Sequence, residues 1–153
     1  MTQTKVWIYQ ADRFLNDQEL QTVKNALTEF TSDWKAHGVK LTASYEIKDR
    51  LFVIIKVVED QQNATGCSID SSVHFMKELQ ATLGVNFFNR QRVAYQENGE
   101  TKHCSMAEFK KLVIEGAVNA DTQVFNNTVA DFDSFEKGWL TSAANSWHKM
   151  LLS

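Results

Sequence analysis

One short segment combines residue types that could hold an anion or supply a nucleophile: Gly66-Cys67-Ser68-Ile69-Asp70. Because an apolar stripe follows it, the segment is expected to open a helix. Free N–H groups at a helix start favour bound anions and lower the pKa of a thiol, and glycine permits close approach. We therefore predict a ligand-binding recess formed by Gly66, Cys67, Ser68, Asp70 and His74. In the alternative interpretation, Ser68 or Asp70 caps the helix and Cys67 is ordinary packing.

Helix geometry argues against a catalytic triad made of Cys67, Asp70 and His74. Seven residues place Cys67 and His74 nearly on one face, but about 10.5 Å apart along the axis. That separation exceeds hydrogen-bond reach between a nucleophile and its base. Asp70 and His74 can interact at i and i+4. A reactive Cys67 would need a base from elsewhere, such as His103 or His148.

Metal and nucleotide motifs are missing from the sequence. His103 and Cys104 are adjacent in an expected strand, so their side chains point to opposite faces, and neither Cys-x-x-Cys nor His-x-x-x-His spacing occurs. None of the six glycines precedes Lys-Ser or Lys-Thr, as a P-loop requires. We therefore predict no metal, no cofactor and no ATPase site.

Large aromatic side chains gather near the C-terminus: Phe132, Phe135, Trp139 and Trp147. They could form a partner-binding patch, or they could close an open sheet face as core. Trp147 and His148 could also join a pocket with His74, and we include both as candidate ligand-binding residues.

The N-terminal half predicts a strand, a helix and a hairpin. The strand covers 6–9, and the helix begins at the N-cap Asn16, with Glu19 completing a capping box. Gly38 is expected to end the helix. One apolar stripe follows the helical period: Leu20, Val23, Leu27, Phe30 and Trp34.

A hairpin is expected over 41–58. A two-residue turn at 49–50 would set apolar residues opposite polar ones. A three-residue loop at 48–50 instead pairs the apolar residues, and we prefer it. The apolar residues on both faces of 51–58 predict a central strand.

The rest of the chain alternates helices and short strands. A helix from Gly66 is expected to end at Gly84. Its buried stripe is expected to consist of Ile69, Val73, Met76, Leu79 and Leu83. Strands at 92–95 and 101–104 flank Asn98-Gly99, a strong hairpin signal. Ser105 and Glu108 form a capping box for a helix that ends at Gly116. A strand near 124–125 and a helical region over 131–152 complete the chain.

This order predicts an α+β fold: a ferredoxin-like β-α-β-β-α-β sandwich carrying a C-terminal β-α-β-α extension packed on it. The sandwich would cover 1–97 and the extension 98–153, as parts of one compact domain. Another α+β packing with the same element order is the alternative.

Composition limits the function classes. Apolar residues make up 43% of the 153, which is enough for a core, and no run approaches the roughly 18 needed for a membrane span. A net charge of −3 with scattered arginines argues against nucleic-acid binding. The first residues lack the apolar region of a signal peptide, and two cysteines suit a reduced, cytoplasmic setting.

Nearly the whole chain resembles a family of short bacterial proteins named "ABC transporter ATPase". The resemblance is carried by Val6-Trp7-Ile8-Tyr9-Gln10, Trp34-Lys35-Ala36-His37-Gly38, Ala64-Thr65-Gly66-Cys67-Ser68-Ile69-Asp70, Ser72-Val73-His74-Phe75, Val124-Phe125-Asn126-Asn127 and Ser146-Trp147-His148. The missing P-loop indicates that the family name is a misnomer.

Residues 95–125 show a second, weaker resemblance, to GYF-type adaptor domains. It rests on Asn98-Gly99, on the segment from Ser105 to Val118, and on Asp121-Thr122 with Val124-Phe125. Those domains are taken to be protein-interaction modules. The chain departs from them at Lys102-His103-Cys104 and lacks the Gly-Tyr-Phe tripeptide.

These observations favour a non-catalytic domain that binds an unknown protein or small molecule at the start of the second helix. The alternative is a thiol-dependent enzyme that uses Cys67, with Asp70 and His74 nearby.

Overall fold

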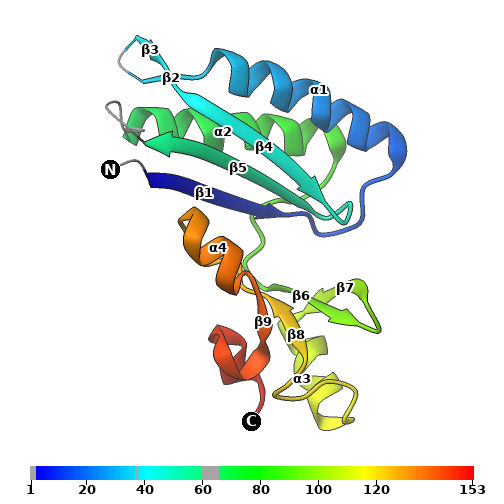
Figure 1. The fold of residues 1–153 in the computed structure, drawn as a ribbon. Coiled ribbons are helices and arrows are strands. Elements are labelled where there is room, and N and C mark those ends of the chain that lie inside the picture. The colour runs from blue at the N-terminus through cyan, green and yellow to red at the C-terminus, as the bar shows by residue number, and fades with distance from the viewer. Residues whose placement is uncertain (1–2, 37, 60–65) are drawn as a thin grey trace. The chain divides into compact units, whose positions relative to one another are not determined.

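The chain folds into two compact units (Figure 1). A computed structural model describes residues 3–36, 38–59 and 66–153, but not the side chains at 3, 36, 39, 59 and 66–69. Residues up to Phe88, together with 130–132, form the first unit, and 89–129 with 133–153 form the second. The α+β class is confirmed, and the predicted division into 1–97 and 98–153 stays a prediction.

The first unit is built on a three-stranded antiparallel sheet with the order β1-β5-β4. Its strands are β1 (Gln3–Gln10), β4 (Thr42–Lys48) and β5 (Phe52–Glu59). Phe52 and Ile54 on one face of β5 and Val53 and Ile55 on the other are fully buried. The expected central position of this strand is therefore confirmed.

The ferredoxin-like topology is not confirmed. In that fold a fourth strand, here expected at 92–95, would pair with the first strand and make it central. The segment instead forms β6 (Arg92–Glu97), which pairs with β7 (Glu100–Ser105) on one side and β8 (Gln123–Phe125) on the other. Both edges of β6 are thus used within the second sheet, which leaves none for β1.

The hairpin between β4 and β5 has the predicted faces but a different register. Its loop contains three residues, Asp49, Arg50 and Leu51, rather than 48–50, so that Tyr45 lies opposite Ile55. Asp49 and Arg50 have positive φ values of 56° and 57°, which turn the chain sharply. The shift of two residues along one strand keeps the same side chains on the same face.

Helix α1 (Asp17–Asp33) begins as predicted. The Glu19 N–H donates to the Asn16 side-chain oxygen at 2.8 Å, and the Asn16 N–H donates to the Glu19 carboxylate at 3.0 Å. The helix ends before the expected stop, because Trp34 is already extended. Gly38, with φ 76°, lies instead between the short strands β2 (Lys35–Ala36) and β3 (Val39–Lys40).

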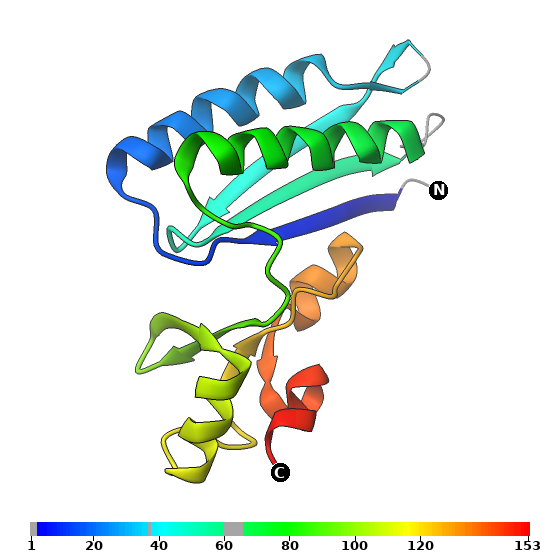
Figure 2. The same ribbon diagram turned by 180° about the vertical axis from the view of Figure 1, so that it is seen from behind.

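Helix α2 (Gly66–Leu83) lies beside α1 on the same face of the sheet (Figures 1 and 2). Met76 and Leu79 of the predicted stripe are buried, and Gly84 follows the helix with φ 67°. The Ile69 side chain of that stripe lies outside the described residues. A hydrogen bond between the side chains of Tyr9 and Ser72 links α2 to β1.

The second unit contains a four-stranded antiparallel sheet with the order β7-β6-β8-β9, where β9 is Leu140–Ser142. Asn98 and Gly99 form the predicted two-residue turn, both with positive φ. Helix α3 (Met106–Ile114) carries the predicted Ser105–Glu108 capping box, and Gly116 follows it with φ 80°. Phe109 of this helix is fully buried among Val93, Val124 and other residues of the unit's own core.

The predicted helical region over 131–152 is wrong as a single element. It is divided into α4 (Phe132–Gly138), strand β9 and two short 3-10 helices, Ala143–Asn145 and Trp147–Leu151. Pairing of Gln123–Phe125 with Leu140–Ser142 extends the sheet, and this gain competes with helix formation. None of the described helices has both the length and the apolar character that a bilayer crossing requires.

Candidate functional site

The predicted recess at the start of α2 is described only in part. The helix begins at Gly66, as expected, but the side chains of Cys67 and Ser68 lie outside the described residues. Asp70 is exposed on the first turns of the helix. A reactive or ligand-binding Cys67 therefore stays a prediction.

His74 does not pair with Asp70 in the described structure. Its Nε2 lies 3.2 Å from Glu78 Oε1, one turn further along α2, and both side chains are more than two-thirds exposed, at 75% and 69%. The pair is an ordinary i, i+4 contact on a solvated helix face. A role for His74 as a base thus has no support from a buried or oriented ring.

Trp147 and His148 belong to the packing of the second unit, whereas residues 66–74 belong to the first. His148 is fully buried, and its Nδ1 lies 2.7 Å from the Ser146 hydroxyl. Burial lowers the pKa of His148 to about 4. Its ring is therefore neutral at pH 7. The grouping of these two residues with His74 stays a prediction.

The second cysteine, Cys104, and the other candidate base, His103, both belong to the second unit. Cys104 is buried in the second unit, and burial, followed by the charge of Glu108, raises its pKa to about 11. His103 Nδ1 lies 2.5 Å from an Arg92 guanidinium nitrogen. With a pKa of about 11, the Cys104 thiol is almost entirely protonated at neutral pH and is a poor nucleophile.

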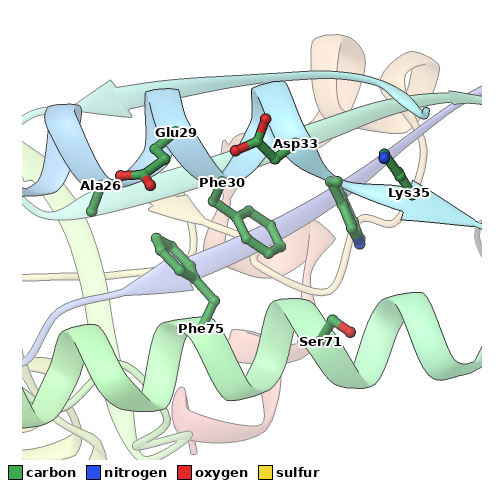
Figure 3. Close-up of a pocket in the computed structure, with 8 residues that line it drawn as sticks. Ala26, Glu29, Phe30, Asp33, Lys35, Ser71 and Phe75 are labelled. Atoms are coloured by element: carbon green, nitrogen blue, oxygen red, sulfur yellow. The ribbon is translucent and has the colours of Figure 1, made fainter.

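A groove of about 520 Å³ lies between α1 and α2 (Figure 3). It is lined by one side of the last turns of α1, by the residues that follow that helix and by the first turns of α2. The described lining residues are Ala26, Glu29, Phe30, Asp33, Trp34, Lys35, Ser71 and Phe75. This volume falls in the range of pockets that hold small molecules.

Aromatic rings form the apolar part of the groove. Phe30 and Phe75 point toward one another from α1 and α2 (Figure 3), and their rings stack with centroids 4.4 Å apart and planes 16° apart. The ring centroid of Trp34 lies 5.1 Å from that of Phe30, and the Trp34 side chain is 4% exposed. Phe30 and Phe75, by contrast, are only half-buried. Part of each phenylalanine surface therefore remains accessible.

Charged groups lie on the same part of the groove. Glu29 and Asp33 are one helical turn apart on α1 and lie beside Phe30 (Figure 3). Both are exposed, and neither makes an ion pair or a side-chain hydrogen bond within the described part of the chain. Lys35 also lines the groove and has an interaction of its own. The formal charge of the lining is therefore −1, from two carboxylates and one ammonium.

The spacing of α1 explains why these residues share one face. Phe30 and Trp34 are four residues apart, as are Glu29 and Asp33, so that an aromatic row and an acidic row run in parallel. Ala26 and Ser71 are small and leave space on either side of the stacked rings.

At the far end of the two helices, Arg13 joins them: it binds Glu19 through two nitrogens and donates to the Leu83 carbonyl at 3.1 Å.

The sequence did not indicate this groove. Phe30 and Trp34 belong to the predicted buried stripe of α1, because aromatic residues at helical spacing are typical of a core. The sequence contained one usable signal: two acidic residues directly precede the last two aromatic residues of that stripe. It could not show that Phe75 of α2 would meet Phe30.

The described lining offers mainly aromatic rings and carboxylates. Among the described lining residues, the only hydroxyl is that of Ser71, and no histidine accompanies it. Within the described residues, no group of three or more His, Cys, Asp or Glu side chains could hold a metal ion. Comparisons with protein-family models, with curated proteins and with solved structures found no match to this chain.

Proposed function

We propose that this chain is a binding domain and that its ligand is a small molecule held in the groove between α1 and α2. The observation that carries the proposal is a groove of about 520 Å³ that combines accessible aromatic rings with two carboxylates that have no ionic partner among the described residues. Binding pockets typically combine an apolar lining with a few polar groups that orient the ligand.

The groove also refines the position of the site expected from the sequence. Ser71 and Phe75 lie on α2 immediately beyond the predicted segment 66–70, so the proposal keeps the start of this helix and adds α1 as its second wall. The resemblance to short bacterial proteins covers part of this region, through residues 34–38 and 72–75. We propose that this chain and those bacterial proteins share the groove, and that neither this chain nor those proteins hydrolyse ATP.

A variant that fills the groove tests the proposal. Ala26→Met places a longer side chain in the space beside Phe30 and keeps a residue that favours helices. Small aromatic fragments, beginning with benzyl alcohol and indole, are titrated into the isotope-labelled chain while backbone and ring NMR signals are recorded. We expect saturable shifts at Phe30, Ser71 and Phe75 that disappear in the variant.

The control is Ala144→Met, an exposed alanine in the second unit. It should leave fragment binding unchanged. Binding whose shifts map to the second unit, or no saturable binding by any fragment, would overturn the proposal. So would self-association of the chain that Ala26→Met abolishes, because the groove would then be an interface between two copies.

A further inference from the structure

The side chains around the groove restrict the chemistry of its ligand. We infer that the ligand is a small organic cation with a methylated, quaternary ammonium group, an inference that rests on the binding function proposed above. The juxtaposition that carries it is the pair Glu29 and Asp33 beside the accessible rings of Phe30 and Phe75.

The sign of the ligand charge follows from the carboxylates. Glu29 and Asp33 have no ionic partner among the described residues, and together they outweigh Lys35, which has another interaction. An anion would meet two negative charges on the same wall, whereas a cation would neutralise them. Attraction between exposed charges is weak, so the carboxylates alone would give little affinity.

The aromatic rings add the second source of affinity. The face of an aromatic ring carries partial negative charge and attracts a cation placed within about 6 Å of its centre. Trp34 also lines the groove, with its ring centroid 5.1 Å from that of Phe30, but it is only 4% exposed, so the half-buried phenylalanine rings are the ones that meet a ligand. Carboxylates and ring faces therefore favour the same charge from adjacent positions.

The hydrogen-bonding capacity of the groove distinguishes among cations. A primary ammonium carries three N–H donors that lose water on binding and need acceptors. The exposed carboxylates of Glu29 and Asp33 accept from donors on their own wall, but the phenylalanine rings that flank the rest of the space supply no acceptor. A quaternary ammonium has no N–H donor and presents its charge on a surface of methyl groups, so it fits an aromatic lining without leaving a donor unpaired.

Two probes of the same shape separate charge from size. Choline carries a trimethylammonium group, and 3,3-dimethyl-1-butanol is its neutral analogue with carbon in place of nitrogen. Each is titrated into the full chain, and dissociation constants are measured from the ring signals of Phe30 and Phe75. We expect choline to bind in the millimolar range or tighter, and at least about ten-fold more tightly than the neutral alcohol.

A charge-removing variant tests the role of the two carboxylates. Glu29→Gln/Asp33→Asn preserves the shape of both side chains and should reduce the preference for choline to less than about three-fold. The matched control, Glu115→Gln/Glu136→Gln, removes the same charge from exposed positions in the second unit and should leave the preference unchanged. The melting temperature of each variant verifies that it is folded.

The outcomes separate the two proposals. Equal affinities for the two probes would overturn the cationic class and leave the binding function standing. Binding of neutral fragments in the groove without binding of choline would likewise overturn the cationic class and leave the binding function standing. If neither fragments nor probes bind there, the binding function itself is wrong. A preference for choline that persists in Glu29→Gln/Asp33→Asn would overturn the role assigned to these carboxylates.

Discussion

His148 shows how burial sets the properties of a single residue. It is fully buried, its ring stacks on Trp147 with centroids 3.9 Å apart, and its Nε2 has no hydrogen-bond partner among the described residues. Transferring a charged ring into this environment is costly, and this cost lowers the pKa of His148 to about 4. The residue is thus a neutral part of the core.

This pKa predicts a loss of stability in mild acid. The unfolded chain takes up a proton on His148 near pH 6.5, whereas the folded chain does so only near pH 4. The stability that His148 contributes is therefore present above pH 6.5 and declines as the pH falls toward 4, by up to about 3 kcal/mol. The free energy of unfolding, measured in urea between pH 4 and 8, tests this decline.

Two further observations isolate this effect. In His148→Phe, the free energy of unfolding should decline less steeply between pH 6.5 and 4. His74→Gln, a substitution on an exposed helix face, should leave the decline unchanged. The Arg13 side chain lowers the pKa of Glu19 to about 2. The stability that this carboxylate contributes is therefore lost at lower pH, between about 4.5 and 2. An unchanged slope in His148→Phe would contradict the prediction.

The two thiols should differ in reactivity. Cys104 is buried with a pKa of about 11, so it should react with iodoacetamide at pH 8 only after unfolding. In a Cys104→Ser variant, the pH dependence of alkylation then reports on Cys67 alone. For a binding domain we expect an ordinary thiol pKa of about 8.5, or no reaction. A Cys67 pKa well below 7 would instead support the thiol-dependent enzyme.

At the scale of elements, α1 is the part of the fold that the sequence describes best. The capping box of Asn16 and Glu19 is local, since both partners lie within four consecutive residues. Its hydrogen bonds satisfy N–H groups that the first turn of a helix would otherwise leave without acceptors. This helix also carries one wall of the groove.

Removing the cap should weaken the first unit. We expect Asn16→Ala to lower the free energy of unfolding by about 1 kcal/mol, because the Glu19 N–H loses its acceptor. Chemical denaturation measures this loss. Gln18→Ala, an exposed position in the same turn, serves as the control and should change the free energy by less than about 0.5 kcal/mol. Equal effects of the two substitutions would show that the cap contributes nothing specific.

At the scale of the whole molecule, the chain has two hydrophobic cores. Leu27 and Val23 are fully buried in the first unit, and Phe109 is fully buried in the second. The segment 130–132 returns to the first unit, where the Val6 N–H donates to the Ala130 carbonyl at 3.0 Å. The units are therefore connected by the chain at more than one place.

We expect the two cores to open as separate cooperative units. Leu27→Ala should lower the protection of β5 amides against hydrogen exchange by about 2 to 4 kcal/mol and affect β6 amides less. Phe109→Ala should have the opposite pattern. Native-state hydrogen exchange measures both. If each substitution lowers protection equally in β5 and β6, the chain unfolds as one unit.

The features that depend on neighbours along the chain can be predicted from the amino-acid sequence alone. Helix starts, the Asn98-Gly99 turn and the two-sided burial of β5 follow from side chains a few residues apart, so their patterns are visible in one dimension. Pairing between distant strands leaves no such pattern. For that reason the sequence predicted β6 as a strand but assigned it to the wrong sheet.

The position of the candidate site depends on packing between elements that are distant in the sequence. Phe30 and Phe75 are far apart in the sequence, and their stacking depends on how α1 and α2 pack against one sheet. The same packing leaves space beside Ala26 and Ser71 and puts Glu29 and Asp33 on its wall. A stripe that reads as core along one helix thus became the lining of a groove, because burial depends on what the neighbouring element covers.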